Sequence, residues 1–372
     1  MKEGYKALGE FIRQIDIRNT DGKEDNLLGV SVQKQFIPSI ANTVGTDFTK
    51  YKVVKKGQFT YIPDTSRRGD KIAIALLQDY EEGLVSNVYT VFEVIDEEKL
   101  LPEYLMLWFS RPEFDRYARF KSHGSVREIM DWDEMCKVEL PVPSIEKQRS
   151  IVKAYKAITD RIELKRRIND NLEAAMRALF EHFVVSNEAY DFDEAIDDKI
   201  DFINGLAMQN YRPEKDETPI PVIKIRELSQ GYCDENSEFC SNHIDKSHII
   251  QNGDLVFSWS GSLQASFWTS QTAGLNQHLF KVQSDEYPLW FVYEWVTFHL
   301  LNFQRIAENK GTTFGHIKRE DLHNAKIKSV GIDEINKLNN LFQPLLNTII
   351  ANSTELHSLM NYQRVLLARL SR

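Results

Sequence analysis

The feature that most constrains how this chain can fold is an internal duplication whose unit is about half of its 372 residues. Residues 121–143 and residues 309–327 each contain a polar segment with a glycine, a short acidic segment and a β-like run, in the same order. Gly124 and Gly311, which match in the two copies, are 187 positions apart. Ordered matches of this length do not arise from chance likeness between short polar segments. We therefore predict two copies of one unit.

Each copy is predicted to end in a long helix. Ser144 follows two prolines and is suited to cap a helix, because its hydroxyl can accept a hydrogen bond from a free backbone amide. From there apolar residues step alternately by four and three positions, which is the spacing of a coiled-coil seam. Arg177 and Arg364, near the two helix ends, are again 187 positions apart. The seam residues are Ile151, Tyr155, Ile158, Ile162, Leu172, Met176, Leu179 and Phe183 in the first copy, and Ile335, Leu338, Phe342, Leu345, Ile349, Leu356, Leu359, Leu366 and Leu370 in the second.

Polar residues interrupt both seams. Lys165 and Asn352 occupy equivalent places, and Asn169 is a further polar residue in the first seam. A polar residue in an apolar seam costs stability but fixes register, so these side chains are expected to align the helices; solvated local fraying is the alternative. Pro344 removes a backbone donor and is expected to kink or restart the second helix near residues 340–345.

The predicted fold class is α+β, with two mixed α/β domains, two long antiparallel coiled-coil helices and a pseudo-twofold internal duplication. Runs such as residues 71–76 and 89–94 are typical of strands. Residues 101–109 and 288–296 are expected to form amphipathic helices whose aromatic side chains belong to the core rather than to a base-stacking surface. The predicted boundaries are 1–143 for the first domain, 144–184 for the first helix, 185–331 for the second domain and 332–372 for the second helix.

The charge of the chain limits the kinds of partner it can bind. A net charge of −9 and a pI near 5.6 argue against a protein that coats nucleic acid through bulk positive charge. DNA binding would have to come from local basic patches. No apolar run approaches the roughly 20 residues of a membrane span, and the polar N-terminus lacks the features of a signal peptide, so we expect a cytoplasmic protein.

The three cysteines cannot all pair within the chain, and reduced thiols are expected. Cys233, Cys240, His243 and His248 could supply four zinc ligands, but their spacing matches no common zinc module. We predict no bound metal.

Several polar segments combine hydrogen-bonding side chains with isolated positive charges, as DNA reading requires. For any single residue, an ordinary solvated loop is the alternative; for the segments together we favour DNA. The candidates in the first half are Arg67, Arg68, Lys121, Ser122, His123, Ser125 and Arg127. Those in the second half are Gln209, Asn210, Tyr211, Arg212, Ser258, Trp259, Ser260, Ser262, Lys310, Thr312, Thr313, His316, Lys318 and Arg319.

This arrangement resembles the specificity subunits of type I restriction-modification systems, in which two target recognition domains alternate with two conserved helices. The likeness spans almost the whole chain. It differs at residues 330–332, where the second helix lacks a proline-rich start, and at Pro344. The likeness is carried by residues 140–143 before a helix with Glu146 and Gln148, and by residues 253–262, 275–282 and 310–313.

The resemblance implies that each domain reads one part of a split double-stranded DNA target. It implies that the helices bind two DNA methyltransferase subunits, which carry S-adenosylmethionine and modify adenine, and that restriction or translocase subunits join through that complex. This chain itself would then bind no cofactor, because the pocket for the unstacked adenine would belong to the partner.

The sequence contains no Asn-Pro-Pro-Tyr type adenine motif, no phosphate-binding Gly-x-x-x-x-Gly-Lys loop and no His-Glu-x-x-His metal site. We therefore expect a non-catalytic subunit. One alternative is a structural coiled-coil adaptor whose globular ends bind proteins. Another, a self-sufficient DNA methyltransferase, would require a cofactor site that the sequence does not display.

Overall fold

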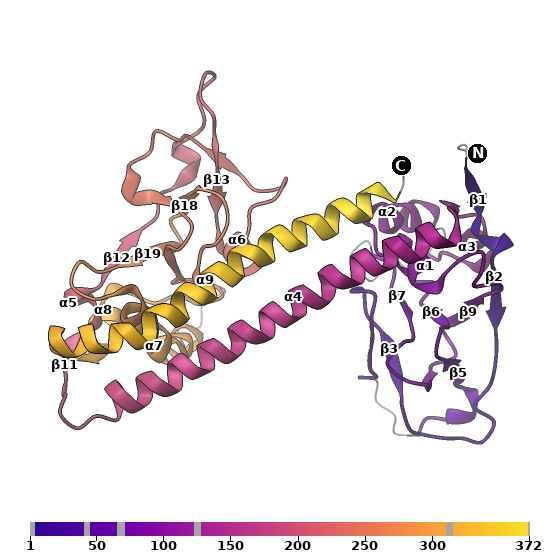
Figure 1. Ribbon diagram of the computed structural model, residues 1–372, viewed down its shortest axis with the longest axis horizontal. Helices are drawn as coiled ribbons and strands as arrows, with labels where there is room; N and C mark the ends of the chain where they lie inside the picture. The colour runs from indigo at the N-terminus through magenta and orange to yellow at the C-terminus, as the bar shows by residue number, and fades with distance from the viewer. Residues whose placement is uncertain (1–3, 41–44, 65–70, 123–127, 310–314, 371–372) are drawn as a thin grey trace. The chain divides into compact units, whose positions relative to one another are not determined.

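The computed structural model describes residues 4–40, 45–64, 71–122, 128–309 and 315–370. The chain forms two compact units (Figure 1). The first comprises Met1–Asp160 and Tyr362–Arg372, and the second Arg161–Asn361. Both long helices therefore contribute residues to both units.

The first unit is built around a four-stranded antiparallel sheet in the order β2-β9-β6-β7. Phe59 and Phe92 stack on this sheet with ring centroids 4.9 Å apart, and Phe109 meets both rings edge-on. Three strand pairs, β1-β10, β3-β4 and β5-β8, complete the β structure. The strands are β1 (Tyr5–Ala7), β2 (Ile12–Ile15), β3 (Leu28–Val30), β4 (Phe36–Pro38), β5 (Lys52–Lys55), β6 (Phe59–Tyr61), β7 (Ile74–Leu76), β8 (Glu82–Val85), β9 (Thr90–Val94) and β10 (Glu139–Pro141), and the short helices are η1 (Leu8–Glu10), η2 (Phe48–Lys50), α1 (Pro102–Phe109), α2 (Pro112–Lys121) and α3 (Trp132–Cys136).

The second unit repeats the main sheet, in the order β12-β19-β16-β17. A second four-stranded sheet has the order β14-β13-β18-β15, and β11 pairs with β20. The strands are β11 (Phe192–Ala195), β12 (Asp201–Asn204), β13 (Ile220–Ile223), β14 (Phe239–Cys240), β15 (Ile249–Ile250), β16 (Leu255–Ser258), β17 (Ala265–Phe267), β18 (Ala273–Leu275), β19 (Leu279–Gln283) and β20 (Lys326–Lys328). The helices are α5 (Ile196–Lys199), α6 (Ile225–Gln230), α7 (Leu289–Asn309) and α8 (Arg319–His323), with short turns η4 (Met208–Asn210) and η5 (Lys246–His248).

The duplication predicted from the sequence is confirmed by the elements themselves. The two main sheets have the same strand order. Several elements also begin 187 positions after their counterparts, as Gly311 does after Gly124. These pairs are β1 and β11, α1 and α7, α3 and α8, and β10 and β20.

One proline explains a difference between the copies. α1 ends at Phe109 and α2 begins at Pro112, whereas α7 is a single helix over the equivalent stretch. Proline lacks the backbone donor that a helix interior needs, and its ring clashes with the carbonyl four residues earlier, so Pro112 is tolerated only at a helix start. His299 stands at the equivalent position in α7, and the helix continues.

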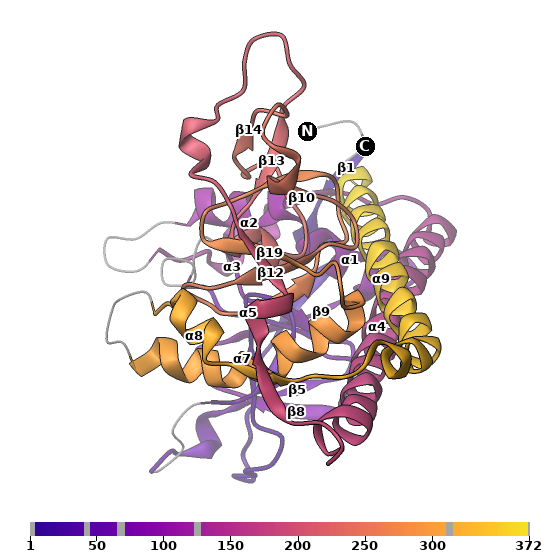
Figure 2. The same cartoon turned by 90° about the vertical axis from the view of Figure 1, so that its left-hand side faces the viewer.

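The long helices are α4 (Ile145–Phe180) and α9 (Ile332–Arg369) (Figure 1, Figure 2). Within the second unit they run antiparallel: Lys165 Nζ donates to Asn352 Oδ1 at 2.6 Å, and Asn169 Nδ2, further along α4, donates to the Ile349 carbonyl at 3.2 Å. Lys165 and Asn352 are equivalent residues of the two copies. The two helices therefore meet at the same position of the repeat.

The polar seam residues form a connected cluster. Asn352 Nδ2 donates to Asn169 Oδ1 at 2.8 Å, and Asn169 Nδ2 also reaches Ser353 Oγ at 3.0 Å. Lys165 Nζ lies 3.0 Å from a Glu355 carboxylate oxygen, and Arg161 pairs with the same carboxylate. Asn169 and Asn352 are buried, so these contacts satisfy groups that water cannot reach.

Two expectations for the helices differ from the structure. Phe183 was expected in the seam and is 36% exposed, whereas Phe180 and Val184 are buried. The cause is a wider turn, η3 (Glu181–Val185), which has π-helical geometry and shifts the residues after α4 around the axis. Pro344 does not restart α9, which is continuous through it; Pro344 lies at an exposed position.

The start of α9 keeps the geometry of α4 although the prolines are missing. Ile335 N donates to the Gly331 carbonyl at 3.1 Å, and the equivalent Gln148 N donates to the Ser144 carbonyl at 3.0 Å. Within the described part of the chain, no helix is long and apolar enough to span a membrane.

Candidate nucleic-acid interface

Two of the segments singled out in the second half of the sequence lie side by side in the second unit. Ser260 and His316 form an isolated antiparallel bridge. Gly261 N donates to the Gly315 carbonyl at 2.8 Å, and Ile317 N donates to the Trp259 carbonyl at 3.0 Å. The fold thus joins the end of β16 to the segment before α8, although more than 50 residues separate them in the sequence.

A third segment, residues 276–278 between β18 and β19, belongs to the same surface. Trp259 N donates to the His278 carbonyl at 3.4 Å, and Gln277 N donates to the Leu206 carbonyl at 2.9 Å. Asn276 is buried, and its side-chain oxygen accepts from His278 N at 3.2 Å. The turn is therefore held by its neighbours on both sides.

Sequence reasoning noted residues 275–282 as carrying the family likeness but missed residues 276–278 as site residues. A usable signal was present, because Asn276, Gln277 and His278 form a polar run between two apolar strands. Such a run at the end of a strand is where a scaffold usually displays functional side chains.

Aromatic and imidazole rings gather where the three segments meet. The Trp259 ring centroid lies 5.8 Å from that of His278 and 6.4 Å from that of His316. Ser260 Oγ is 3.2 Å from His278 Nδ1. His278 is exposed and His316 half-buried, so hydrogen-bonding groups reach the surface here beside an aromatic face.

Two of the proposed DNA contacts are instead internal, and a third is held by protein groups. Ser258 is fully buried, and its hydroxyl donates to the Ser260 carbonyl at 3.0 Å, so it cannot touch DNA. Ser260 is only 8% exposed and holds His278. The Arg319 guanidinium donates to the Phe202 carbonyl at 2.6 Å and lies 4.7 Å from the Phe280 ring centroid. The two serines therefore support the surface rather than form it, whereas Arg319 is exposed although its guanidinium is engaged.

The other described candidates of the second unit reach the surface. Ser262 and Lys318 are exposed. The Lys318 backbone N–H donates to Asp321 Oδ2 at 2.7 Å, and the Lys318 ammonium group takes no part in that bond. The η4 segment, which follows Leu206, exposes four side chains, and Arg212 lies 3.9 Å from a Glu238 carboxylate oxygen. The four are Gln209, Asn210, Tyr211 and Arg212.

The first unit joins its two equivalent segments in the same way. Asp64 and Ile129 form an isolated antiparallel bridge, and Met130 N donates to the Pro63 carbonyl at 2.9 Å. Ile129 and His316 are 187 positions apart, so the two bridges are equivalent. Lys121 and Ser122 lie at the end of α2, where the Ser122 hydroxyl donates to the Ala118 carbonyl at 2.6 Å. The remaining candidates, Arg67, Arg68, His123, Ser125, Arg127, Lys310, Thr312 and Thr313, lie outside the described residues.

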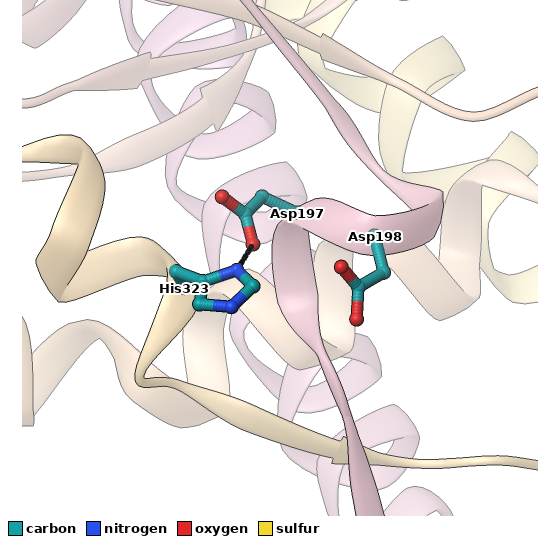
Figure 3. Close-up of side chains that lie close together, drawn as sticks. All are labelled: Asp197, Asp198 and His323. Atoms are coloured by element: carbon teal, nitrogen blue, oxygen red, sulfur yellow. Dashed lines mark hydrogen bonds and ion pairs between the residues drawn. The ribbon is translucent and has the colours of Figure 1, made fainter.

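One group of potential metal ligands comes together among the residues that the structure describes: Asp197, Asp198 and His323, whose ligand atoms lie within 4.8 Å of one another (Figure 3). Each carboxylate already has a protein partner. Asp197 Oδ1 is 3.0 Å from His323 Nδ1, and Asp198 Oδ2 accepts from Ala195 N at 2.9 Å. The group therefore ties α5 to α8, and we assign no ion to it.

The four residues weighed as zinc ligands do not gather in this way. Burial raises the pKa of Cys233 to about 12 and that of Cys240 to about 11. Burial thus favours the neutral thiol at both positions, whereas zinc binds the thiolate.

The chain resembles known proteins in both sequence and fold. Residues 13–174 match the type I restriction modification DNA specificity domain. The type I restriction enzyme MjaIX specificity subunit of Methanocaldococcus jannaschii is 24% identical over 305 residues, which cover 74% of this chain and 70% of that protein. The HindI specificity subunit of Haemophilus influenzae is 28% identical over 194 residues, 50% of this chain and 40% of its own length.

The crystal structure of the type I restriction-modification S subunit from M. genitalium shares the fold, with a TM-score of 0.58 at 12% sequence identity. The match covers 99% of this chain and 96% of that one. Residues 13–174 thus belong to the type I restriction modification DNA specificity domain family, and the chain as a whole is similar in sequence and fold to type I specificity subunits.

Proposed function

We propose that this chain is a non-catalytic subunit in which each unit reads one half of a bipartite double-stranded DNA target. The observation that carries the proposal is that the same pairing of two surface segments is built twice, by the equivalent bridges Asp64–Ile129 and Ser260–His316. Two copies of one recognition surface with different side chains suit a target with two different halves. Because the net charge of the chain is −9, its affinity for DNA must come from such local surfaces.

We also propose that the long helices dock two DNA methyltransferase subunits that carry S-adenosylmethionine, with restriction or translocase subunits joining through that complex. Support comes from α4, where Leu164 is 49% exposed and Ile168, one turn further, is 36% exposed. Both are apolar and lie outside the seam. An exposed apolar stripe on a helix is a surface that a protein partner can cover.

The function is tested by combining the full chain with its methyltransferase and a DNA library, and sequencing the methylated adenines. The proposal predicts one motif made of two short specific halves with an unspecified spacer between them. Methylation with no shared motif, or a single continuous motif, would contradict it. In that case the acidic chain would be better explained as a coiled-coil adaptor whose globular ends bind proteins.

A further inference from the structure

The turn between β18 and β19 presents the carboxamide of Gln277 beside the joined segments. Its backbone is fixed by the bond from Gln277 N to Leu206 O, and Asn276 N donates to the Ile223 carbonyl at 3.1 Å. The Gln277 side chain is half-buried. A base-contacting side chain on so rigid a turn loses little conformational entropy when DNA binds, which favours selectivity.

His278 orients that carboxamide. Gln277 Nε2 lies 3.4 Å from His278 Nε2, and His278 Nδ1 lies 3.2 Å from Ser260 Oγ. An amide nitrogen can only donate, so His278 Nε2 is the acceptor and the ring proton resides on Nδ1, from which it is donated to Ser260. Ser260 is in turn fixed by its bridge to His316.

These contacts use one of the two hydrogens on the Gln277 amide nitrogen. Within the described part of the chain, the second hydrogen and the side-chain oxygen have no hydrogen-bond partner, so Gln277 retains one donor and one acceptor. This pair matches the major-groove edge of adenine, where N6 donates and N7 accepts. Guanine offers two acceptors on that edge, and cytosine and thymine do not offer this pair.

We propose that Gln277 reads an adenine in the half-site recognised by the second unit, with His278 and Ser260 as positioning residues. This inference rests on the proposed function, because it assumes that this surface faces DNA. It adds a specificity-determining residue and the base that it selects.

The first unit carries a different side chain at the same place. β9 and β19 occupy equivalent positions in the two main sheets, and their buried residues match when Phe92 is aligned with Phe280, so Tyr89 corresponds to Gln277. Tyr89 packs against buried apolar residues of the first unit. The first unit therefore lacks a carboxamide, with its paired donor and acceptor, at this place.

The test uses the Gln277→Val variant of the full chain with its methyltransferase and a DNA library randomised across both half-sites. We expect discrimination to fall by about 10-fold to 100-fold at one adenine position of one half-site, with every other position unchanged. Gln277→Glu should move the preference at that position toward cytosine, whose N4 donates to a carboxylate. Gln251→Val is the matched control. Gln251 is an exposed amide in a turn, and the next residue, Asn252, bonds to Thr354 of α9.

His278→Phe keeps a ring but removes the acceptor, and should relax the same position more weakly. Combined with Gln277→Val, it should add nothing further, whereas a merely structural role would lower methylation at every position. An unchanged motif in Gln277→Val, or relaxation at a base other than adenine or in the other half-site, overturns this inference while the two-part motif stands. If the unaltered chain gave no two-part motif, the proposed function itself would fail.

Discussion

At the scale of single residues, the two copies show how one change compensates another. Gln148 is fully buried; its side chain accepts from Leu101 N at 2.9 Å and donates to the Lys99 and Pro143 carbonyls at 2.9 Å. In the second copy Pro288 replaces Leu101 and has no N–H to satisfy. Ile335, also buried, replaces Gln148. A buried amide is thus present only where a buried donor requires it.

Glu294 is a buried residue for which no such compensation exists. It is 1% exposed, and its Oε1 has no hydrogen-bond partner among the residues that the structure describes. Burial raises its pKa to about 7, against the opposing effect of Arg177. Because the folded-state pKa exceeds the usual 4.5, the folded protein holds this proton more tightly than the unfolded chain does. Stability should therefore fall as the pH rises from about 4.5 to about 7, and the loss is complete above that range.

We predict that Glu294→Gln stabilises the protein at pH 8 by on the order of 2 kcal/mol and has little effect at pH 5, since glutamine mimics the protonated acid. Urea denaturation at the two pH values measures this. Glu163→Gln, an exposed residue of α4, is the control and should change neither value. A gain of equal size at both pH values would show that the Glu294 carboxyl is not the titrating group.

Which residues line the candidate site could be predicted only in part. The segments at 258–262 and 315–319 stood out by composition, and the structure joins them. Ser258 could not be recognised as internal, because β16 lies between β17 and β19 and is buried on both faces, which removes the alternation that marks a surface strand. The contacts of Arg319 could not be foreseen, because its partners, Phe202 and Phe280, are distant in sequence.

At the scale of elements, the long helices were the most predictable part. Their apolar spacing predicted two coiled-coil helices, which pair antiparallel. The polar seam residues Lys165, Asn169 and Asn352 meet as a cluster. The π-helical turn after α4 was not predictable, since it depends on packing and leaves no periodic signal. Strands of two residues, such as β14 and β15, are also too short to show a period, so the second sheet was missed.

The polar cluster should behave as one unit. Asn352→Leu alone removes the donor to the buried Asn169 Oδ1 and leaves Lys165 Nζ paired with Glu355, and we predict a loss of about 1–3 kcal/mol in the free energy of unfolding. Asn169→Leu with Asn352→Leu should cost less than the sum of the single changes, because neither asparagine is then left unpaired. A double-mutant cycle by urea denaturation measures the coupling. Strictly additive losses would mean that the side chains act independently.

At the scale of the whole molecule, the repeated offset of 187 residues links the sequence to the fold. It relates β10 to β20 and α4 to α9, so these elements pack alike in both units. The segments between them diverge in length, and there the units differ: the first has separate strand pairs where the second has a four-stranded sheet. We infer that the regular elements maintain the framework while the intervening segments determine what each unit recognises.

The most direct test of the central claim, that each unit reads its own half of a DNA target, is an exchange of residues 185–331 for the same region of a relative with a different target. Methylated adenines are then sequenced for the exchanged chain with its methyltransferase. The account predicts that one half of the motif takes the relative's sequence while the other half is retained. Replacement of both halves together, or of neither, in a chain that still directs methylation would contradict it.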